Sequence, residues 1–151
     1  TVTTQGFALG LNYYFANYFM VQGNYSWNKL NTAETDPIVP AFNTPEHKFN
    51  VGFSARDIPL HIGSKRNVWG FNVNYKWIEG FTYEGFSQFT GDIPTYSLLD
   101  AQINCSIFRT NTTLKLGASN LLNNKQFQVY GGPRIGRMAY LSMVYNFQKK
   151  D

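Results

Sequence analysis

The chain has 151 residues, of which 17% are aromatic and only 15% are charged, and its 13 basic and nine acidic residues leave a net charge of +4. The aromatic content excludes a disordered chain, and the single cysteine excludes an internal disulfide. No run of about 18 apolar residues exists, so no transmembrane helix is expected. The first ten residues lack the basic start and apolar core of a signal peptide, so we expect a mature segment or a piece of a longer protein.

Apolar and other residues alternate along seven stretches, a period typical of half-buried β-strands. In the first stretch, Phe7, Leu9 and Leu11 alternate with small or polar residues. No window has a convincing helical period, so we predict an all-β fold with seven antiparallel strands. The predicted strands are 6–13, 19–28, 49–55, 69–77, 99–107, 113–119 and 138–147.

The connections between these strands alternate in length. Residues 15–18 and 109–112 form tight turns, and 56–67 is expected to form a medium turn. Long loops are expected at 29–48, 79–96 and 120–137, and loops of this length are usually functional or flexible. Short connections therefore gather at one end of the sheet and long loops at the other.

The two faces of the predicted sheet differ in chemistry. One face holds no charged residue and no amide, whereas the other is rich in Asn, Gln, Ser and Gly and carries few charges. Small uncharged polar groups suit a confined, wet interior, and Lys76 and Asp100 have the parity of cross-strand partners there. The residues predicted to face this interior are Asn72, Asn74, Lys76, Asp100, Gln102 and Asn104.

Aromatic residues fall near both ends of the apolar face. Trp69 and Trp77 lie eight residues apart on one strand, about 20 Å along a tilted barrel wall. This is close to the apolar band of an outer-membrane barrel, about 25 Å tall with an aromatic girdle at each rim. The alternative is the core of a soluble β-sandwich. The predicted girdle consists of Trp27, Trp69, Trp77, Tyr145 and Phe147.

Seven strands do not close a bacterial single-chain barrel, because such barrels have an even strand number and lipid does not tolerate unpaired strand edges. The chain is therefore expected to be part of a larger barrel, unless an eighth strand escapes the pattern. The stretches that bear on its family are NTPEHKFNVGFS (43–54), GFNVNYKW (70–77), IPTYSLLDAQIN (93–104) and TTLKLGASNLLNNKQFQVYGGPRIGRMAYLSMVYNF (112–147).

With these stretches the chain resembles the C-terminal part of the barrel of a TonB-dependent outer-membrane receptor of the Bacteroidetes type. The resemblance implies a transmembrane β-barrel of about 22 strands around a plug, located in the bacterial outer membrane. Residues 1–147 would be barrel and 148–151 a short polar tail, which departs from the family's usual terminal aromatic. The long loops would then be extracellular, and Phe147 would lie at the periplasmic end.

The family resemblance also implies a function and partners. It implies import of a scarce ligand, an iron chelate, cobalamin, glycan or peptide, with energy supplied through TonB. The implied partners are outer-membrane lipid and lipopolysaccharide, the plug and remaining strands, TonB through the N-terminal part, and a surface lipoprotein. Nucleic acid is not expected, because the basic excess sorts to the short-turn end of the sheet rather than to a groove. The alternatives are a structural or adhesive barrel that grips a protein and a soluble ligand-binding β-sandwich.

Signals for enzymatic chemistry are poor, and neither a cofactor nor a metal is expected. His47 and His61 fall at opposite ends of the predicted sheet, and Cys105 lies on the lipid-facing side. Weak ligand-binding candidates are the loop residues Tyr83, Phe86, Phe89, Tyr130 and Arg134.

Two interpretations of these loop residues stay open. The aromatic rings would stack on a ring of a ligand, or they would pack against neighbouring loops. Arg134 would meet an anionic ligand or a lipopolysaccharide phosphate, it would pair with Glu79 or Glu84, or it would simply be solvated.

Overall fold

The computed structural model describes residues 3–31, 42–62 and 65–147. Its main element is one antiparallel sheet in which each strand pairs with the next strand of the sheet along the chain. A separate two-stranded hairpin lies in one of the loops. The prediction of an all-β fold with seven antiparallel strands is confirmed. The strands of this sheet are β1 (Thr3–Phe15), β2 (Phe19–Asn31), β3 (His47–Ile62), β4 (Lys65–Ile78), β7 (Tyr96–Ile107), β8 (Thr112–Ser119) and β9 (Met138–Tyr145).

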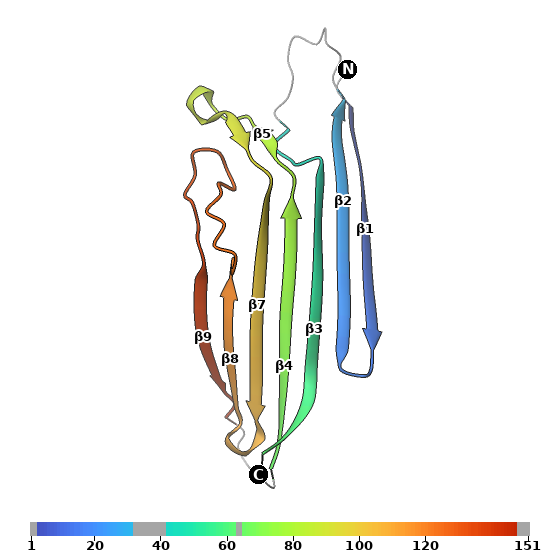
Figure 1. Cartoon of the computed structure of the whole chain (residues 1–151), viewed down its shortest axis with the longest axis vertical. Coiled ribbons are helices and arrows are strands. Elements are labelled where there is room, and N and C mark those ends of the chain that lie inside the picture. The colour runs from blue at the N-terminus through green and yellow to red at the C-terminus, as the bar shows by residue number, and fades with distance from the viewer. Residues whose placement is uncertain (1–2, 32–41, 63–64, 148–151) are drawn as a thin grey trace.

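Long and short connections lie at opposite ends of this sheet, as Figure 1 shows. The short end holds the turn Ala16–Tyr18 and the 3-10 turn η2 (Phe108–Thr110) between β7 and β8. Because each strand reverses direction, β1 begins at the long-loop end and β9 finishes at the short-turn end. The predicted sorting of loops by length is confirmed.

The predicted medium turn at 56–67 is wrong, because both strands continue through it. A β-bulge interrupts the register between Ala55 and Ile58, and Asp57 takes the left-handed conformation with φ 57°. Beyond the bulge, Ile58 pairs with Trp69 and Leu60 with Asn67. The extra residue in the bulge moves the apolar side chains from odd to even positions, so the strand no longer follows strict alternation along its whole length.

Strand lengths also differ from the prediction. β1 and β2 have 13 residues each and β3 has 16, whereas β9 has eight. Ladder hydrogen bonds do not require apolar side chains, so pairing extends into polar ends such as Thr3–Asn31 and Gln5–Lys29. The predicted loop 79–96 contains its own hairpin, β5 (Phe81–Tyr83) and β6 (Gly91–Ile93), joined through the 3-10 turn η1 (Ser87–Phe89).

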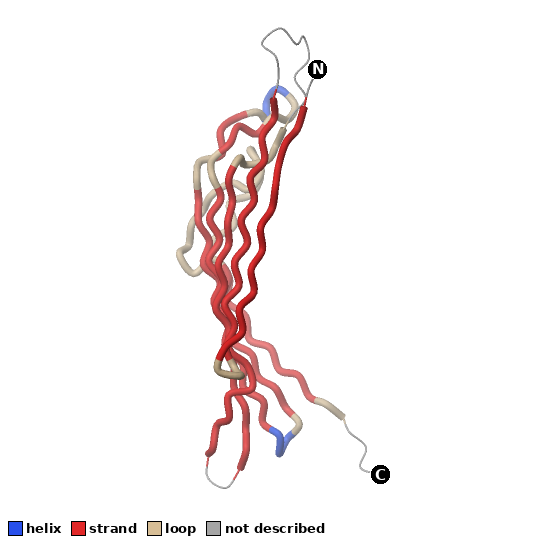
Figure 2. Tube along the Cα trace, turned by 90° about the vertical axis from the view of Figure 1, so that its right-hand side faces the viewer, coloured by secondary structure: helices blue, strands red, loops and turns tan. Residues whose placement is uncertain are grey.

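The sheet is a single layer, seen edge-on and twisted in Figure 2. Among the described residues, Ala55 and Ile93 are the only buried apolar side chains. The accessible surface is 10829 Å², whereas a compact chain of 17.3 kDa exposes about 7,800 Å². The described residues therefore form no core of their own, and the apolar face of the sheet is left open.

Candidate functional site

Aromatic rings form two clusters on the apolar face. At the long-loop end, the ring of Phe7 lies 5.8 Å from that of Trp27, and Phe49 stacks on Trp77 at 5.4 Å. The short-turn cluster consists of Tyr13, Phe15, Phe19, Phe53, Phe71 and Trp69.

An aliphatic band separates the two clusters. It includes Leu11, which is 69% exposed, together with Val51 and Val73. The predicted girdle residues Trp27 and Trp77 join the long-loop cluster, and Trp69 joins the other. Tyr145 and Phe147 form a separate edge-to-face pair at 4.6 Å.

Polar groups border the cluster at the long-loop end. The indole Nε1 of Trp27 donates to Glu46 Oε1 at 3.1 Å, and the Tyr25 hydroxyl is hydrogen-bonded to His47 Nδ1 at 2.6 Å. The backbone N–H of His47 donates to the Glu79 carboxylate at 2.9 Å. Aromatic side chains with one apolar and one hydrogen-bonded end are suited to a boundary between apolar and aqueous surroundings.

The six residues predicted to face the lumen share the other face of the sheet. Asn72 lies opposite Gln102, Asn74 opposite Asp100, and Asn104 opposite Gly70. Lys76 lies opposite Leu98, so Lys76 and Asp100, which were predicted as cross-strand partners, are diagonal neighbours on adjacent strands. Asp100 Oδ1 instead accepts a hydrogen bond from the backbone N–H of Asn120 at 2.9 Å.

Several glycines of this polar face lie beneath side chains of the neighbouring strand. A Cβ at Gly117 would lie 2.3 Å from the Tyr140 ring, and one at Gly52 would lie 2.8 Å from Gln22. Tyr140 crosses Gly117 and donates through its hydroxyl to Gln102 Oε1 at 2.9 Å. The glycines thus let polar side chains lie flat along the wall.

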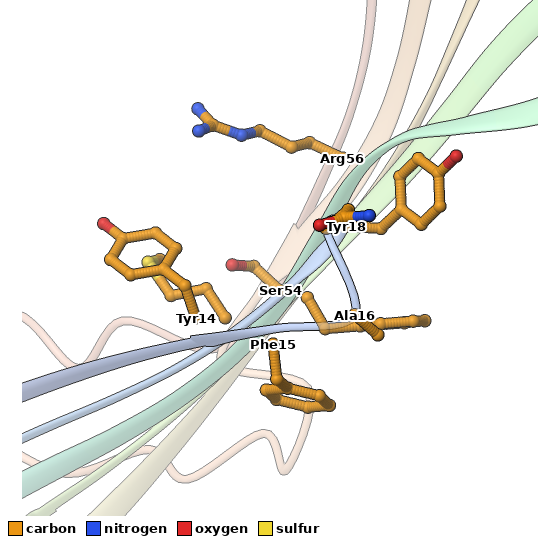
Figure 3. A pocket seen from close by; sticks show the side chains of 9 residues that line it. Tyr14, Phe15, Ala16, Tyr18, Ser54 and Arg56 are labelled. Atoms are coloured by element: carbon orange, nitrogen blue, oxygen red, sulfur yellow. The ribbon is translucent and has the colours of Figure 1, made fainter.

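A hollow of about 380 Å³ lies at the turn between β1 and β2. Figure 3 shows Tyr14, Ser54 and Arg56 on one side of the sheet and Phe15 on the other. Arg56 therefore points to the polar side, inside the bulge. Its backbone N–H donates to the Tyr18 carbonyl at 3.0 Å, so Arg56 lies at the short-turn end of the sheet.

The loop 120–137 is anchored to the sheet by Asn120, which is 6% exposed and has φ 51°. Its Nδ2 donates to the carbonyls of Asn124 and Ile135, and its Oδ1 accepts from the backbone N–H of Asn124. Asn124 Nδ2 in turn donates to the carbonyl of Ser97, in β7. These bonds fix both ends of the loop next to the strand.

Two long loops, 79–96 and 120–137, meet around an aromatic hollow of about 520 Å³, a size typical of small-molecule sites. Four of the five predicted ligand-binding residues line it: Tyr83, Phe86, Phe89 and Tyr130. Val129 and three glycines complete the lining, and no charged residue contributes to it.

Glycines allow the aromatic rings around this hollow to approach the backbone of the opposite loop. A Cβ at Gly91 would lie 2.3 Å from the Tyr130 ring, and one at Gly131, where φ is +76°, would lie 2.6 Å from Phe89. Loop packing thus accounts for Phe89 and Tyr130. It does not account for Phe86, which is 86% exposed and free to meet a ligand.

Arg134 stands apart from the hollow. Its guanidinium lies 4.4 Å from the centre of the Phe127 ring, which is 6.2 Å from the Tyr130 ring. The carboxylate of Glu79 accepts from His47, and the backbone of Glu84 is bonded on both sides by the Asn43 amide. The cation–π contact orients Arg134 while leaving its N–H groups available.

Further chemistry is sparse in the described ranges. His47 and His61 lie near opposite ends of β3, and no group of three or more His, Cys, Asp or Glu residues within 3–31, 42–62 and 65–147 is placed to hold a metal ion. Cys105 is half-buried opposite Trp69 and Leu114 on the apolar face. In the part of the chain that is described, no helix has the length and apolar character to cross a membrane.

Comparison with known protein families, curated proteins and solved structures finds no match to this chain.

Sequence reasoning missed Asn43, Asn120 and Asn124 as residues that position the loops. The repeated Asn residues after β8 were the available signal, since Asn is common in left-handed turns and bonds local backbone groups.

Proposed function

We propose that this chain forms part of the wall and outer loops of a TonB-dependent outer-membrane receptor that imports a scarce ligand. The observation that carries the proposal is the uncovered apolar face, with an aromatic cluster toward each end and an aliphatic band between them. Lipid is the covering that matches this banded pattern. The polar face then lines a water-filled interior, and β1 and β9 pair with further strands of the barrel.

The long loops are extracellular in this proposal, and the aromatic hollow is the candidate contact for the imported ligand. Its exposed Phe86 and glycine-rich floor suit a flat ring, which stacks on an aromatic face. The loop 120–137 is held to the sheet by Asn120, and the amide of Asn43 bonds the backbone of Glu84 in the loop 79–96. A site held in this way loses less conformational entropy on binding.

The proposal is tested on the full-length protein purified from its native membrane. We expect it to fractionate with the outer membrane, to need detergent to stay monodisperse, and to bind the periplasmic domain of TonB. Monodispersity without detergent would support a soluble β-sandwich instead. A membrane barrel that lacks a plug and does not bind TonB would support the structural or adhesive alternative.

A further inference from the structure

A second hollow, of about 560 Å³, lies on the polar face toward the long-loop end of β1 to β4. Its lining includes Lys48 and Lys76 together with Asn24, Ser26 and Asn50. Two small residues of β1, Ala8 and Gly10, also line the hollow, and β1 pairs with β2. The hollow is thus distinct from the aromatic hollow between the outer loops.

The strand register brings the two lysines together. Lys48 pairs with Ile78 and Asn50 with Lys76, so the lysines are diagonal neighbours on adjacent strands. Such neighbours are about 7–8 Å apart, within reach of two long side chains converging on one small ion. Ser26 lies directly opposite Lys48, and Asn24 directly opposite Asn50. Three adjacent strands therefore present two cations and several hydrogen-bonding groups within one patch.

The carboxylates near this pair have hydrogen-bond donors of their own. Glu46 and Glu79 accept from Trp27 and His47, and Asp100, a diagonal neighbour of Lys76, accepts from the backbone N–H of Asn120. The buried Ser26 Oγ also has no hydrogen-bond partner in the described structure. Like charges on adjacent strands repel, and a buried hydroxyl without a partner is costly, so both features favour a bound anion.

We propose that Lys48 and Lys76 form a binding site for a doubly charged oxyanion, a phosphate or sulfate group, on the wall of the import path. The inference rests on the proposed function and deepens it, because it gives the imported ligand such a group. Lysine ammonium groups bind phosphate as point charges, and Asn24, Asn50 and Ser26 can donate hydrogen bonds to its oxygens. Since the pair lies on the polar face, the anion reaches it through water rather than through lipid.

The test uses the full-length protein in lipid nanodiscs at low ionic strength, titrated separately with inorganic phosphate, sulfate and acetate by calorimetry. We expect phosphate and sulfate to bind more tightly than acetate. Lys48→Gln and Lys76→Gln should each weaken phosphate binding about three- to fivefold. The matched control is Lys115→Gln, a lysine on the same face opposite Asn104 and Ser142, which should leave binding unchanged.

Equal losses from all three substitutions, or no phosphate binding by the parent protein, would overturn the anion site. A loss of thermal stability in the Lys48→Gln/Lys76→Gln double variant without phosphate would also overturn it. That loss would mean that a carboxylate elsewhere in the protein already neutralises the two lysines. Outer-membrane location and TonB binding are measured on the same preparations. If those hold while phosphate binding fails, the proposed function stands and only the anion site falls.

Discussion

The two faces of the sheet are built from the same strands but carry different kinds of side-chain contact. On the apolar face, rings contact rings, and residues such as Leu11 and Val51 remain uncovered. On the polar face, the side chains of Gln22 and Tyr140 lie over glycines of the next strand, and Tyr140 hydrogen-bonds to Gln102. The apolar face therefore depends on its surroundings for stability, whereas the polar face satisfies part of its bonding within the wall.

The largest expected effect comes from placing a charge on each face at adjacent positions of β4. Val73→Arg puts a cation in the aliphatic band, whereas Asn72→Arg puts it on the polar face. In lipid vesicles we expect Val73→Arg to lower the free energy of unfolding by about 2–4 kcal/mol. Asn72→Arg should cost less than about 1 kcal/mol.

Denaturant titration of the full-length protein in vesicles measures both values. Equal costs for Val73→Arg and Asn72→Arg would mean that the two faces meet the same solvent, which contradicts the membrane assignment.

A smaller effect is expected where the wall meets the loops. Asn120→Ala removes a buried amide and leaves the carbonyls of Asn124 and Ile135 without their donor, a cost of about 1–3 kcal/mol. Asn123→Ala is the matched control, because Asn123 also has positive φ, 54°, but its side chain accepts only the backbone N–H of Arg137 in an exposed position.

Hydrogen exchange across residues 120–137 measures the effect on the loop. Asn120→Ala should speed exchange throughout the loop, while Asn123→Ala should change it only locally. Similar profiles for the two variants would show that Asn120 is not the anchor.

Glycine substitutions compare the faces at the level of a single methyl group. Gly117→Ala displaces the Tyr140 ring and its hydrogen bond to Gln102, which we expect to cost about 1 kcal/mol. Gly23 lies on the apolar face with nothing within 4 Å of its Cβ position, so Gly23→Ala should be neutral or slightly stabilising. The measurement is the free energy of unfolding of both variants in lipid vesicles. An equal loss for Gly23→Ala and Gly117→Ala would contradict the described contacts.

The smallest expected effect on stability concerns the aromatic hollow. Phe86 is 86% exposed, so Phe86→Ala should change the unfolding free energy by less than about 0.5 kcal/mol. Phe89 packs on Gly131, so Phe89→Ala should cost more. A large loss of stability in Phe86→Ala, measured by thermal denaturation, would indicate that Phe86 has a structural role instead.

Alternation along the strands was sufficient to predict the sheet and its two faces, because a period of two places Trp69, Phe71 and Val73 together without knowledge of distant contacts. It did not reveal the bulge at Asp57, where one extra residue reverses the parity. The hairpin β5–β6 was also missed, since Phe81–Tyr83 and Gly91–Ile93 are too short for a repeating pattern.

The candidate sites, like the fold, were predictable from the sequence only in part. The aromatic loop residues were predictable as a group from composition, but their assembly requires Tyr130 to lie on Gly91 in another loop. The lysine pair also depends on register, since sequence parity alone suggested Asp100 as the partner of Lys76. Contacts between distant segments are set by the turns and bulges, which local patterns do not encode.

The most direct test of the membrane assignment compares two adjacent positions on β7. A nitroxide label is attached at Cys105, on the apolar face, and separately at Asn104→Cys in a Cys105→Ser background, on the polar face. In the full-length protein in lipid vesicles, oxygen should relax the label at 105 strongly and a water-soluble nickel chelate should not, with the opposite pattern at 104. Equal accessibility of both labels to the nickel chelate would contradict the account.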